Sequence, residues 1–229
     1  MIALGLEVSP EISPGTLEDW RLSRIKTPHP SHPTPQVQPR DPKSPEHHKR
    51  LLVVATSLNP KSRSQALARI AVEETKALQL EADLLDLRDH PLPLAGTAES
   101  WDDPRVEAVK ECMQQYQRFL FVVPIYNYDT NAAAKNLLEL CGGSWMEGSV
   151  AGFACAAGGR ASYMSALGLM NSLMLDFRVW IAPRFVYVTA ADWSGEDWRD
   201  DTLSAELRTR LRTLVTDVQR GPEHVNHKP

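Results

Sequence analysis

Apolar runs alternate with amphipathic stretches along most of the chain. Five short runs have the apolar and β-branched content expected of buried strands. They lie at residues 51–56, 82–87, 119–123, 150–156 and 179–188, the last of these broken by Pro183. Apolar residues at helical spacing predict five helices, at residues 64–79, 104–117, 131–140, 162–176 and 202–219. This alternation predicts an α/β fold, in which a parallel sheet is covered on both faces as a three-layer, doubly wound sandwich.

The two ends of the chain differ in composition from this alternating region. Nine of the 17 prolines fall within residues 1–50, and proline fixes φ and removes a backbone donor. We therefore expect residues 1–50 to form a mostly disordered arm, residues 51–220 to form the folded domain, and residues 221–229 to be a disordered tail.

The charge balance and the cysteines narrow the classes of function. The formal net charge is −4, whereas proteins that bind nucleic acid need a cationic field. The three cysteines are spread out without a C-x-x-C pair, which favours a reducing compartment over a disulfide framework or a zinc site. No apolar stretch is long enough to span a bilayer, and the first residues lack the basic region of a secretory signal. We therefore expect a cytoplasmic protein that binds neither nucleic acid nor a membrane.

Histidines are nearly missing from the predicted domain. Of the seven histidines, only His90 lies between the arm and the tail, in a proline-rich loop. We therefore expect no catalytic histidine and no metal site.

The first loop of interest follows the strand at 51–56. In doubly wound folds, ligands bind beyond the carboxyl ends of the strands. This loop places Ser57, Ser62 and Ser64 just ahead of, or at the start of, a helix. Hydroxyls beside the free amides of a helix N-terminus make a phosphate cradle, although a serine-rich turn with an N-cap has the same pattern. The loop contains neither a Walker motif nor GxGxxG, which disfavours a nucleoside triphosphate or a dinucleotide.

Two further loops suit a flat ring. The second loop reads Pro124-Ile125-Tyr126-Asn127-Tyr128-Asp129; tyrosines stack on a heteroaromatic ring and an amide bonds its edge, unless the loop simply closes over the core. The third loop contains Gly158, Gly159 and Arg160, and paired glycines let a backbone approach a ligand, unless they only form a turn. A phosphate cradle beside a ring platform describes a mononucleotide with a planar ring, and flavin mononucleotide (FMN) fits that description.

Residues 51–176 resemble the NAD(P)H-dependent FMN reductase family in three motifs that occur in order and in register. The family carries roughly G-S-x-R-x-x-S-x-N/S after the first strand, where this chain reads Thr56-Ser57-Leu58-Asn59-Pro60-Lys61-Ser62-Arg63-Ser64. The family's P-x-Y-N and K-N pattern is matched by Pro124, Tyr126, Asn127, Lys135 and Asn136. A glycine followed ten residues later by Gly-Gly is matched by Gly148, Gly158 and Gly159.

The resemblance implies a flavodoxin-like three-layer sandwich, with a five-stranded parallel sheet of order 2-1-3-4-5. It also implies an FMN-dependent oxidoreductase that passes hydride from NADPH or NADH to the flavin and then to a small-molecule acceptor. That acceptor is a free flavin, a quinone, an azo compound or a metal oxyanion, and no side chain is obligatory as an acid or base. The residues that we expect to bind the cofactor are Ser57, Asn59, Ser62, Arg63, Ser64, Pro124, Ile125, Tyr126, Asn127, Tyr128, Gly158, Gly159 and Arg160.

Several residues depart from the family's pattern. Thr56 stands where glycine is usual and Asn59 where arginine is usual. Loss of the arginine is expected to weaken phosphate binding, and Arg63 or Lys61 could compensate for it. Tyr128-Asp129 replaces the common Gly-Ser, which crowds the ring's edge and bears on substrate preference.

Other functions stay open at the level of sequence. A flavodoxin-like electron carrier would need an acidic stripe around the flavin, where only Asp129 appears, and a non-catalytic flavin-binding module would explain the departures at Asn59 and Tyr128. A serine hydrolase would use Gly142-Gly143-Ser144-Trp145-Met146, which lacks the closing glycine of a nucleophile elbow. The helix at 162–176 is apolar almost all round, which favours either full burial or a subunit interface in a homodimer or homotetramer.

Overall fold

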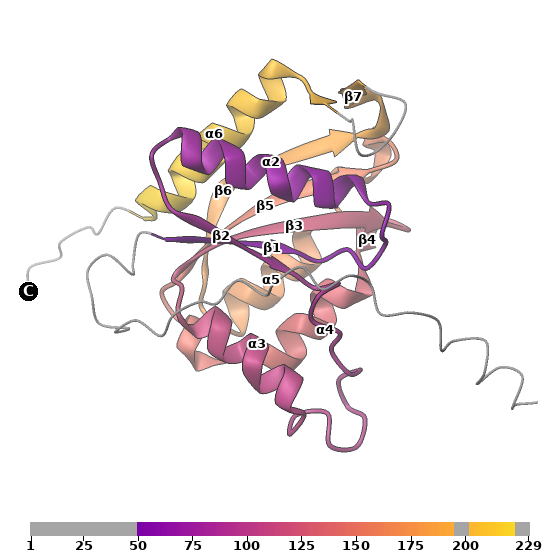
Figure 1. Ribbon diagram of the computed structural model, residues 1–229, viewed down its shortest axis with the longest axis vertical. Helices are drawn as coiled ribbons and strands as arrows, with labels where there is room; N and C mark the ends of the chain where they lie inside the picture. The colour runs from indigo at the N-terminus through magenta and orange to yellow at the C-terminus, as the bar shows by residue number, and fades with distance from the viewer. Residues whose placement is uncertain (1–49, 195–201, 223–229) are drawn as a thin grey trace, which may run out of the picture. The chain divides into compact units, whose positions relative to one another are not determined.

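The computed structural model describes residues 50–194 and 202–222. The predicted arm lies outside the described residues except for Arg50, and of the predicted tail only residues 221 and 222 are described. The described residues form a sheet with helices on both faces (Figure 1).

The sheet contains five parallel strands in the predicted order. They are β1 (Leu51–Ala55), β2 (Ala82–Asp86), β3 (Arg118–Tyr126), β5 (Val150–Ala157) and β6 (Trp180–Thr189). Hydrogen bonding orders them β2-β1-β3-β5-β6, which confirms the flavodoxin-like 2-1-3-4-5 prediction. The sheet has a sixth member that the sequence did not predict, because the two-residue strand β4 (Asp129–Thr130) folds back antiparallel onto β3. A separate two-stranded sheet pairs β7 (Trp193–Ser194) with β8 (Thr202–Leu203).

Helices cover the sheet on opposite faces, as Figure 1 shows. One face carries α2 (Arg63–Ala77) and α6 (Ala205–Arg220), and the other carries α3 (Pro104–Gln114), α4 (Ala132–Cys141) and α5 (Leu167–Leu175). The N-cap of α3 is Asp103, whose side chain accepts a hydrogen bond from the Arg105 amide, and Pro104 is the first residue of the helix. Leu207, Leu211 and Leu214, which lie at helical spacing in α6, are buried.

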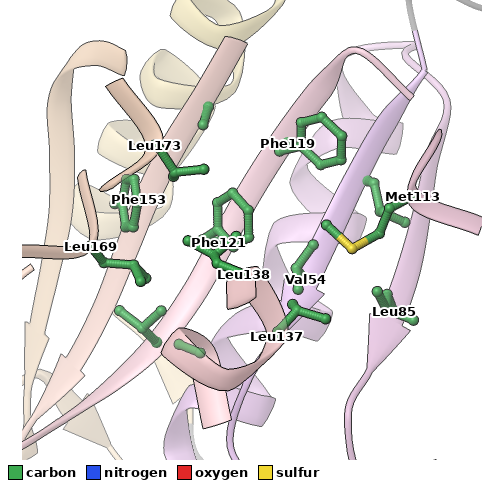
Figure 2. Close-up of a cluster of buried hydrophobic side chains, with 14 of the residues drawn as sticks. Val54, Leu85, Met113, Phe119, Phe121, Leu137, Leu138, Phe153, Leu169 and Leu173 are labelled. Carbon is green, nitrogen blue, oxygen red and sulfur yellow. The ribbon is translucent and has the colours of Figure 1, made fainter. Parts of the chain in front are cut away.

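Each face of the sheet has its own apolar core. On the α3–α5 face, stacked phenylalanines run across the strands, with ring centroids 6.1 Å apart for Phe119 and Phe121 and 5.6 Å apart for Phe121 and Phe153 (Figure 2). On the other face, α6 approaches β5 so closely that a Cβ at Gly152 would lie 2.6 Å from the Val218 side chain. Glycine is therefore required by packing at this position.

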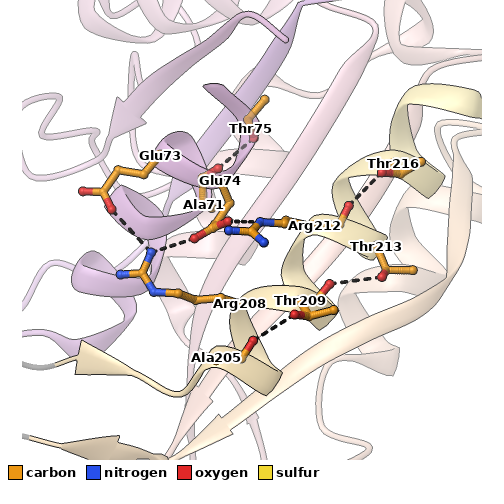
Figure 3. Close-up of polar contacts among 10 residues, drawn as sticks. All are labelled: Ala71, Glu73, Glu74, Thr75, Ala205, Arg208, Thr209, Arg212, Thr213 and Thr216. Atoms are coloured by element: carbon orange, nitrogen blue, oxygen red, sulfur yellow. Dashed lines mark hydrogen bonds and ion pairs between the residues drawn. The ribbon is translucent and has the colours of Figure 1, made fainter. Parts of the chain in front are cut away.

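A buried carboxylate joins the two helices of the second face. Glu74 of α2 is only 4% exposed and pairs with both Arg208 and Arg212 of α6, with 2.7 Å between Glu74 Oε1 and Arg208 Nη1 (Figure 3). Its neighbour Glu73 is exposed and lies 3.7 Å from Arg208. Two cations compensate for the burial of one carboxylate, and the ion pairs link α2 to α6.

Two sequence predictions need correction. Strand β6 is not broken at Pro183: it pairs only with β5, and the pairing shifts register between Ala151 and Phe153, opposite the proline. An edge strand with a bulge tolerates a residue without an N–H. The predicted helix at 162–176 begins only at Leu167, because Arg160–Ser162 forms a separate 3₁₀ turn.

Candidate functional site

The carboxyl ends of β1 and β3 are tied together by a pair of polar side chains. Thr56, fully buried just after β1, donates its hydroxyl proton to Asn131 Oδ1 over 2.8 Å. Asn131 Nδ2 returns a bond of 2.7 Å to the Thr56 carbonyl. The hydroxyl therefore gives Thr56 a structural use where the family usually has glycine. Nothing in the sequence marked Asn131, because a single asparagine at a helix start is common.

The first loop ends in two buried hydroxyls at the start of α2. The Ser62 and Ser64 hydroxyl oxygens lie 2.7 Å apart, and the Ser62 side chain, although at the N-cap, does not cap its own helix. The first turn of α2 carries no acidic residue. Hydroxyls and a helix N-terminus with no competing carboxylate in its first turn fit a phosphate group.

Other residues of this loop hold its shape or link it to neighbouring segments. Ser57 Oγ accepts a hydrogen bond from the Asn59 amide over 3.3 Å, and Asn59 Oδ1 accepts one from the Lys61 amide over 2.9 Å. Arg63 Nη1 donates to the carbonyl of Ala190 over 3.5 Å, which links the loop to the end of β6.

The second loop is a tight hairpin between β3 and β4. Tyr126 pairs with Asp129, so that Asn127 and Tyr128 are the two turn residues, and both have positive φ, 51° and 63°. This is the pattern of a type I′ turn, in which asparagine followed by glycine is favoured. The turn lifts its side chains away from the sheet, and both Tyr126 and Tyr128 are exposed.

The third loop leaves open space above its glycines. A Cβ placed on Gly158 or Gly159 would meet nothing within 4 Å, and neither residue has a positive φ. Neither packing nor a positive φ therefore requires the glycines, and the open space above them leaves room for a ligand. Tyr187 of β6 anchors this loop, since its hydroxyl donates to the Gly159 carbonyl over 2.9 Å and lies 2.6 Å from Ser162 Oγ.

Residues of the second and third loops line one cavity of about 270 Å³. It is lined by Ile125, Asn127, Tyr128, Gly159, Ala161 and Ser162. Four of these are predicted site residues, and none of the six carries a charge. An uncharged cavity with an aromatic residue in its lining fits a planar ring such as that of FMN.

A second cavity, of about 560 Å³, lies at the end of β6 and is lined by Arg160, Tyr163, Tyr187, Thr189, Asp192, Ser204, Glu206, Leu207 and Arg210. The Thr189 hydroxyl and backbone N–H both donate to Asp192 Oδ2, over 2.6 and 2.7 Å, and these bonds lower the pKa of Asp192. Arg160 Nη2 lies 3.7 Å from the same carboxylate. Of the residues that line this second cavity, only Arg160 was predicted from the sequence, because the others come from segments far apart in the chain.

Pro124 and the K-N pair of the resemblance line neither cavity. Pro124 lies within β3, and its carbonyl accepts the Asn131 amide over 3.2 Å. Of the K-N pair in the resemblance, Lys135 pairs with Glu139, and Asn136 bonds both the Pro93 carbonyl and the Ala95 amide over 2.8 Å. The K-N pair therefore supports the scaffold.

The other candidate chemistries find no support in the described residues. Ser144 lies in a short turn between α4 and β5, at the amino end of a strand, whereas a nucleophile elbow follows a strand. Burial raises the pKa of the Cys141 and Cys155 thiols to about 12. Residues 50–194 and 202–222 contain no cluster of three metal-ligating side chains and no helix long and apolar enough to cross a membrane.

Comparison with known proteins agrees with this geometry. A family model described as NADPH-dependent FMN reductase matches residues 49–193. The NAD(P)H-dependent FAD/FMN reductase of Geobacillus thermodenitrificans is 23% identical over 141 residues, which cover 61% of this chain and 75% of that protein.

Solved structures share the fold at low identity. An oxidoreductase from Corynebacterium diphtheriae superposes with a TM-score of 0.61 at 16% identity, covering 76% of this chain and 96% of that one. The flavoenzyme NAD(P)H:(acceptor) oxidoreductase FerB from Paracoccus denitrificans gives a TM-score of 0.58 at 17% identity, covering 76% and 99%.

Proposed function

The chain belongs to the NADPH-dependent FMN reductase family. From that premise we propose that the three loops at the carboxyl ends of β1, β3 and β5 bind FMN, which transfers electrons to a small-molecule acceptor. The family makes it an oxidoreductase that uses FMN and NAD(P)H. FMN, when bound, takes hydride from the reduced nicotinamide and passes two electrons on. The protein's own residues bind and orient the cofactor and exclude water from it.

In this proposal the first loop holds the phosphate. Ser62 and Ser64 present hydroxyls at the N-terminus of α2, and Ser57 shapes the turn with Asn59. The cationic Arg63, anchored at Ala190, is close enough in sequence to supply charge in place of the family's arginine.

The second and third loops hold the ring. Asn127 and Ile125 on one side face Gly159 on the other across the smaller cavity, with Pro124, Tyr126, Tyr128 and Gly158 in the same two loops. The observation that carries the proposal is the open space above Gly159, in the lining of the smaller cavity, which leaves room for a planar ring.

The second cavity supports NADPH over NADH. It places Arg160 and Arg210 around one hollow, while the Asp192 carboxylate is already engaged by Thr189. Two arginines suit the 2′-phosphate that distinguishes NADPH. Glu206 also lines this cavity, and because its carboxylate repels an anion, the two arginines are the groups that an anion would contact.

A homo-oligomer and a cytoplasmic location complete the proposal. Leu167, Met174 and Leu175 of α5 are exposed, as is Met164 just before the helix, whereas Leu169, Met170 and Leu173 are buried. An exposed apolar stripe of this kind favours a subunit interface, and a monomeric mass by light scattering would remove it. The cytoplasmic location rests on the cysteine pattern of the sequence.

A glycine substitution tests the site. Gly159→Val fills the space above the loop without a clash or backbone strain, since φ is −156° there. We expect weaker FMN binding, measured by quenching of flavin fluorescence on titration, with an unchanged midpoint of thermal unfolding (Tm). Gly168→Ala, on the exposed face of α5 where a Cβ also meets nothing, is the matched control. Equal FMN affinity in both variants would contradict the placement of the ring.

A further inference from the structure

The larger cavity, at the end of β6, contains an aromatic surface that the fold leaves partly uncovered. The ring of Tyr163 packs against Phe185 and Tyr187, with centroids 4.8 Å and 5.3 Å apart. Tyr163 nevertheless stays 44% exposed, and it lines the cavity together with Tyr187. A ring that is supported by two others and borders a cavity offers a stacking surface to a flat ligand.

The same cavity contains a carboxylate that a phosphate group does not explain. Glu206 lies in the first turn of α6 and lines the cavity. The other carboxylate of the lining, Asp192, is already engaged by Thr189 and lies 3.7 Å from Arg160. Glu206 is therefore the carboxylate that a hydrogen-bond donor on a ligand can reach. The start of a helix favours an acidic residue by itself, so the test below includes a control for that effect.

These groups together describe one kind of ligand. Two arginines, Arg160 and Arg210, suit a phosphate, Tyr163 suits a flat ring, and Glu206 suits a group that only donates hydrogen bonds. Adenosine 2′-phosphate has all three features, since its base is flat and carries an exocyclic amine. A cavity of about 560 Å³ is within the range of small-molecule sites.

We propose that the larger cavity binds the adenosine 2′-phosphate half of NADPH, with adenine stacked on Tyr163 and its exocyclic amine donating to Glu206. This inference rests on the proposed function, which places only the 2′-phosphate in this cavity, and it adds the residues that recognise the base. Neither side chain takes part in hydride transfer, and both act by binding the end of the dinucleotide remote from the nicotinamide.

The test measures binding without turnover. Oxidised, FMN-loaded protein does not react with NADP⁺, so isothermal titration calorimetry gives its Kd for NADP⁺ and for deamino-NADP⁺, in which hypoxanthine replaces adenine. The deamino form carries a carbonyl oxygen where adenine has its amine, and this oxygen has no proton to donate to Glu206. We expect the wild type to bind NADP⁺ about tenfold more tightly than deamino-NADP⁺.

Glu206→Gln should remove this preference. An amide accepts from the amine of adenine and donates to the carbonyl of hypoxanthine, so the two Kd values should come within about twofold of each other. Glu107→Gln makes the same change in the first turn of α3 and should keep the tenfold preference. This control separates recognition of the base from the effect of a charge at a helix N-terminus.

Tyr163→Ala should weaken both nucleotides equally. Both bases stack, so each Kd should rise about tenfold while their ratio stays at the wild-type value. Tyr163→Phe keeps the ring and should restore both Kd values. Trp180→Ala, which removes a 57% exposed ring from the amino end of β6, should change neither.

Three results would overturn the inference alone. One is a wild type that binds the two nucleotides equally, or a preference that Glu206→Gln retains. The second is an unchanged NADP⁺ Kd in Tyr163→Ala. The third is a loss of bound FMN in Tyr163→Ala that accounts for its weaker binding of NADP⁺, which would make Tyr163 a cofactor contact. Failure of the proposed function looks different, because the wild type itself would then retain no FMN after desalting, or would keep its flavin band when NADPH is added.

Discussion

The two ends of the parallel sheet differ in how their polar groups are paired. At the amino end, Arg50 pairs with Asp83 and Glu81, and the Tyr116 hydroxyl donates to Asp83 over 2.8 Å. The Arg50 guanidinium also lies over the Tyr116 ring, 5.6 Å from its centroid. Every member of this group has a partner within the group, so the amino end serves the fold.

The carboxyl end combines paired groups, such as Thr56 and Asn131, with exposed side chains and unfilled space. Ser62 and Ser64 bond each other at a helix N-terminus, Tyr128 is exposed in a strained turn, and Gly158 and Gly159 border unfilled space. In the proposed function, the flavin contacts the positions at the carboxyl end that border open space and the two hydroxyls that pair only with each other at a helix N-terminus. Substitutions at the two ends should therefore have separable effects on stability and on flavin binding.

The largest effect is expected at the phosphate cradle. Ser62→Asp places a carboxylate where the phosphate should bind, and like charges should weaken FMN binding about 100-fold or more. Aspartate is a good N-cap, so α2 should still form. Flavin absorbance after desalting measures the retained FMN.

The control makes the same change at another helix. Ser204 caps α6, with its Oγ accepting the Leu207 amide over 3.3 Å, and lies outside the three loops. Ser204→Asp should retain FMN. Full retention by Ser62→Asp as well would remove the phosphate from this loop.

The next effect is on stability without a loss of flavin. Glu74→Gln leaves Arg208 and Arg212 without their shared carboxylate and should cost about 2 kcal/mol of unfolding free energy. Glu73→Gln, at the exposed neighbour, should cost no more than about 0.5 kcal/mol. Urea unfolding measures both values, and equal costs would show that burial of Glu74 does not matter.

A smaller effect is expected on the choice of dinucleotide. Arg210→Gln removes one cation from the larger cavity and should lower the ratio of kcat/KM for NADPH to that for NADH about tenfold. Arg220→Gln removes the same charge from the last residue of α6 and should leave the ratio unchanged. If the two variants behave alike, the 2′-phosphate binds elsewhere.

The smallest effect is expected at the amino end. Burial and the neighbouring Asp83 carboxylate raise the pKa of Tyr116 well above its usual range. Below about pH 10 the hydroxyl is protonated in both the folded and unfolded chain. Above that pH the unfolded chain loses this proton while the folded chain keeps it, so the unfolding free energy should fall as pH rises.

Tyr116→Phe checks this account. It should cost about 1 kcal/mol at pH 7 through the lost hydrogen bond to Asp83. It should also reduce the decline in stability above pH 10, measured by urea unfolding across that range, and FMN affinity should not change. A loss of FMN binding in this variant would contradict the separation of the two ends.

Much of the fold was readable because strand and helix periodicities are local. The run from Leu51 to Ala55 is buried at every position, and the order of the five parallel strands follows from the family resemblance. Strand β6 was misjudged at Pro183, since whether a proline is tolerated depends on which strand lies at the edge.

The site was readable only in part. The loops could be chosen because they follow strands, but contacts between them depend on tertiary structure. The Thr56–Asn131 bonds and the Tyr187 anchor join residues 75 and 28 positions apart, and no sequence motif marks such pairs. The cavity around Arg160 and Arg210 has the same origin.

The most direct test of the central claim is a visible absorption spectrum. The purified protein is incubated with FMN, desalted, and recorded before and after anaerobic addition of NADPH. We predict a retained flavin band that bleaches when NADPH is added. A protein that retains no band and shows no turnover of free FMN, or a retained band that NADPH leaves unchanged, would contradict the account.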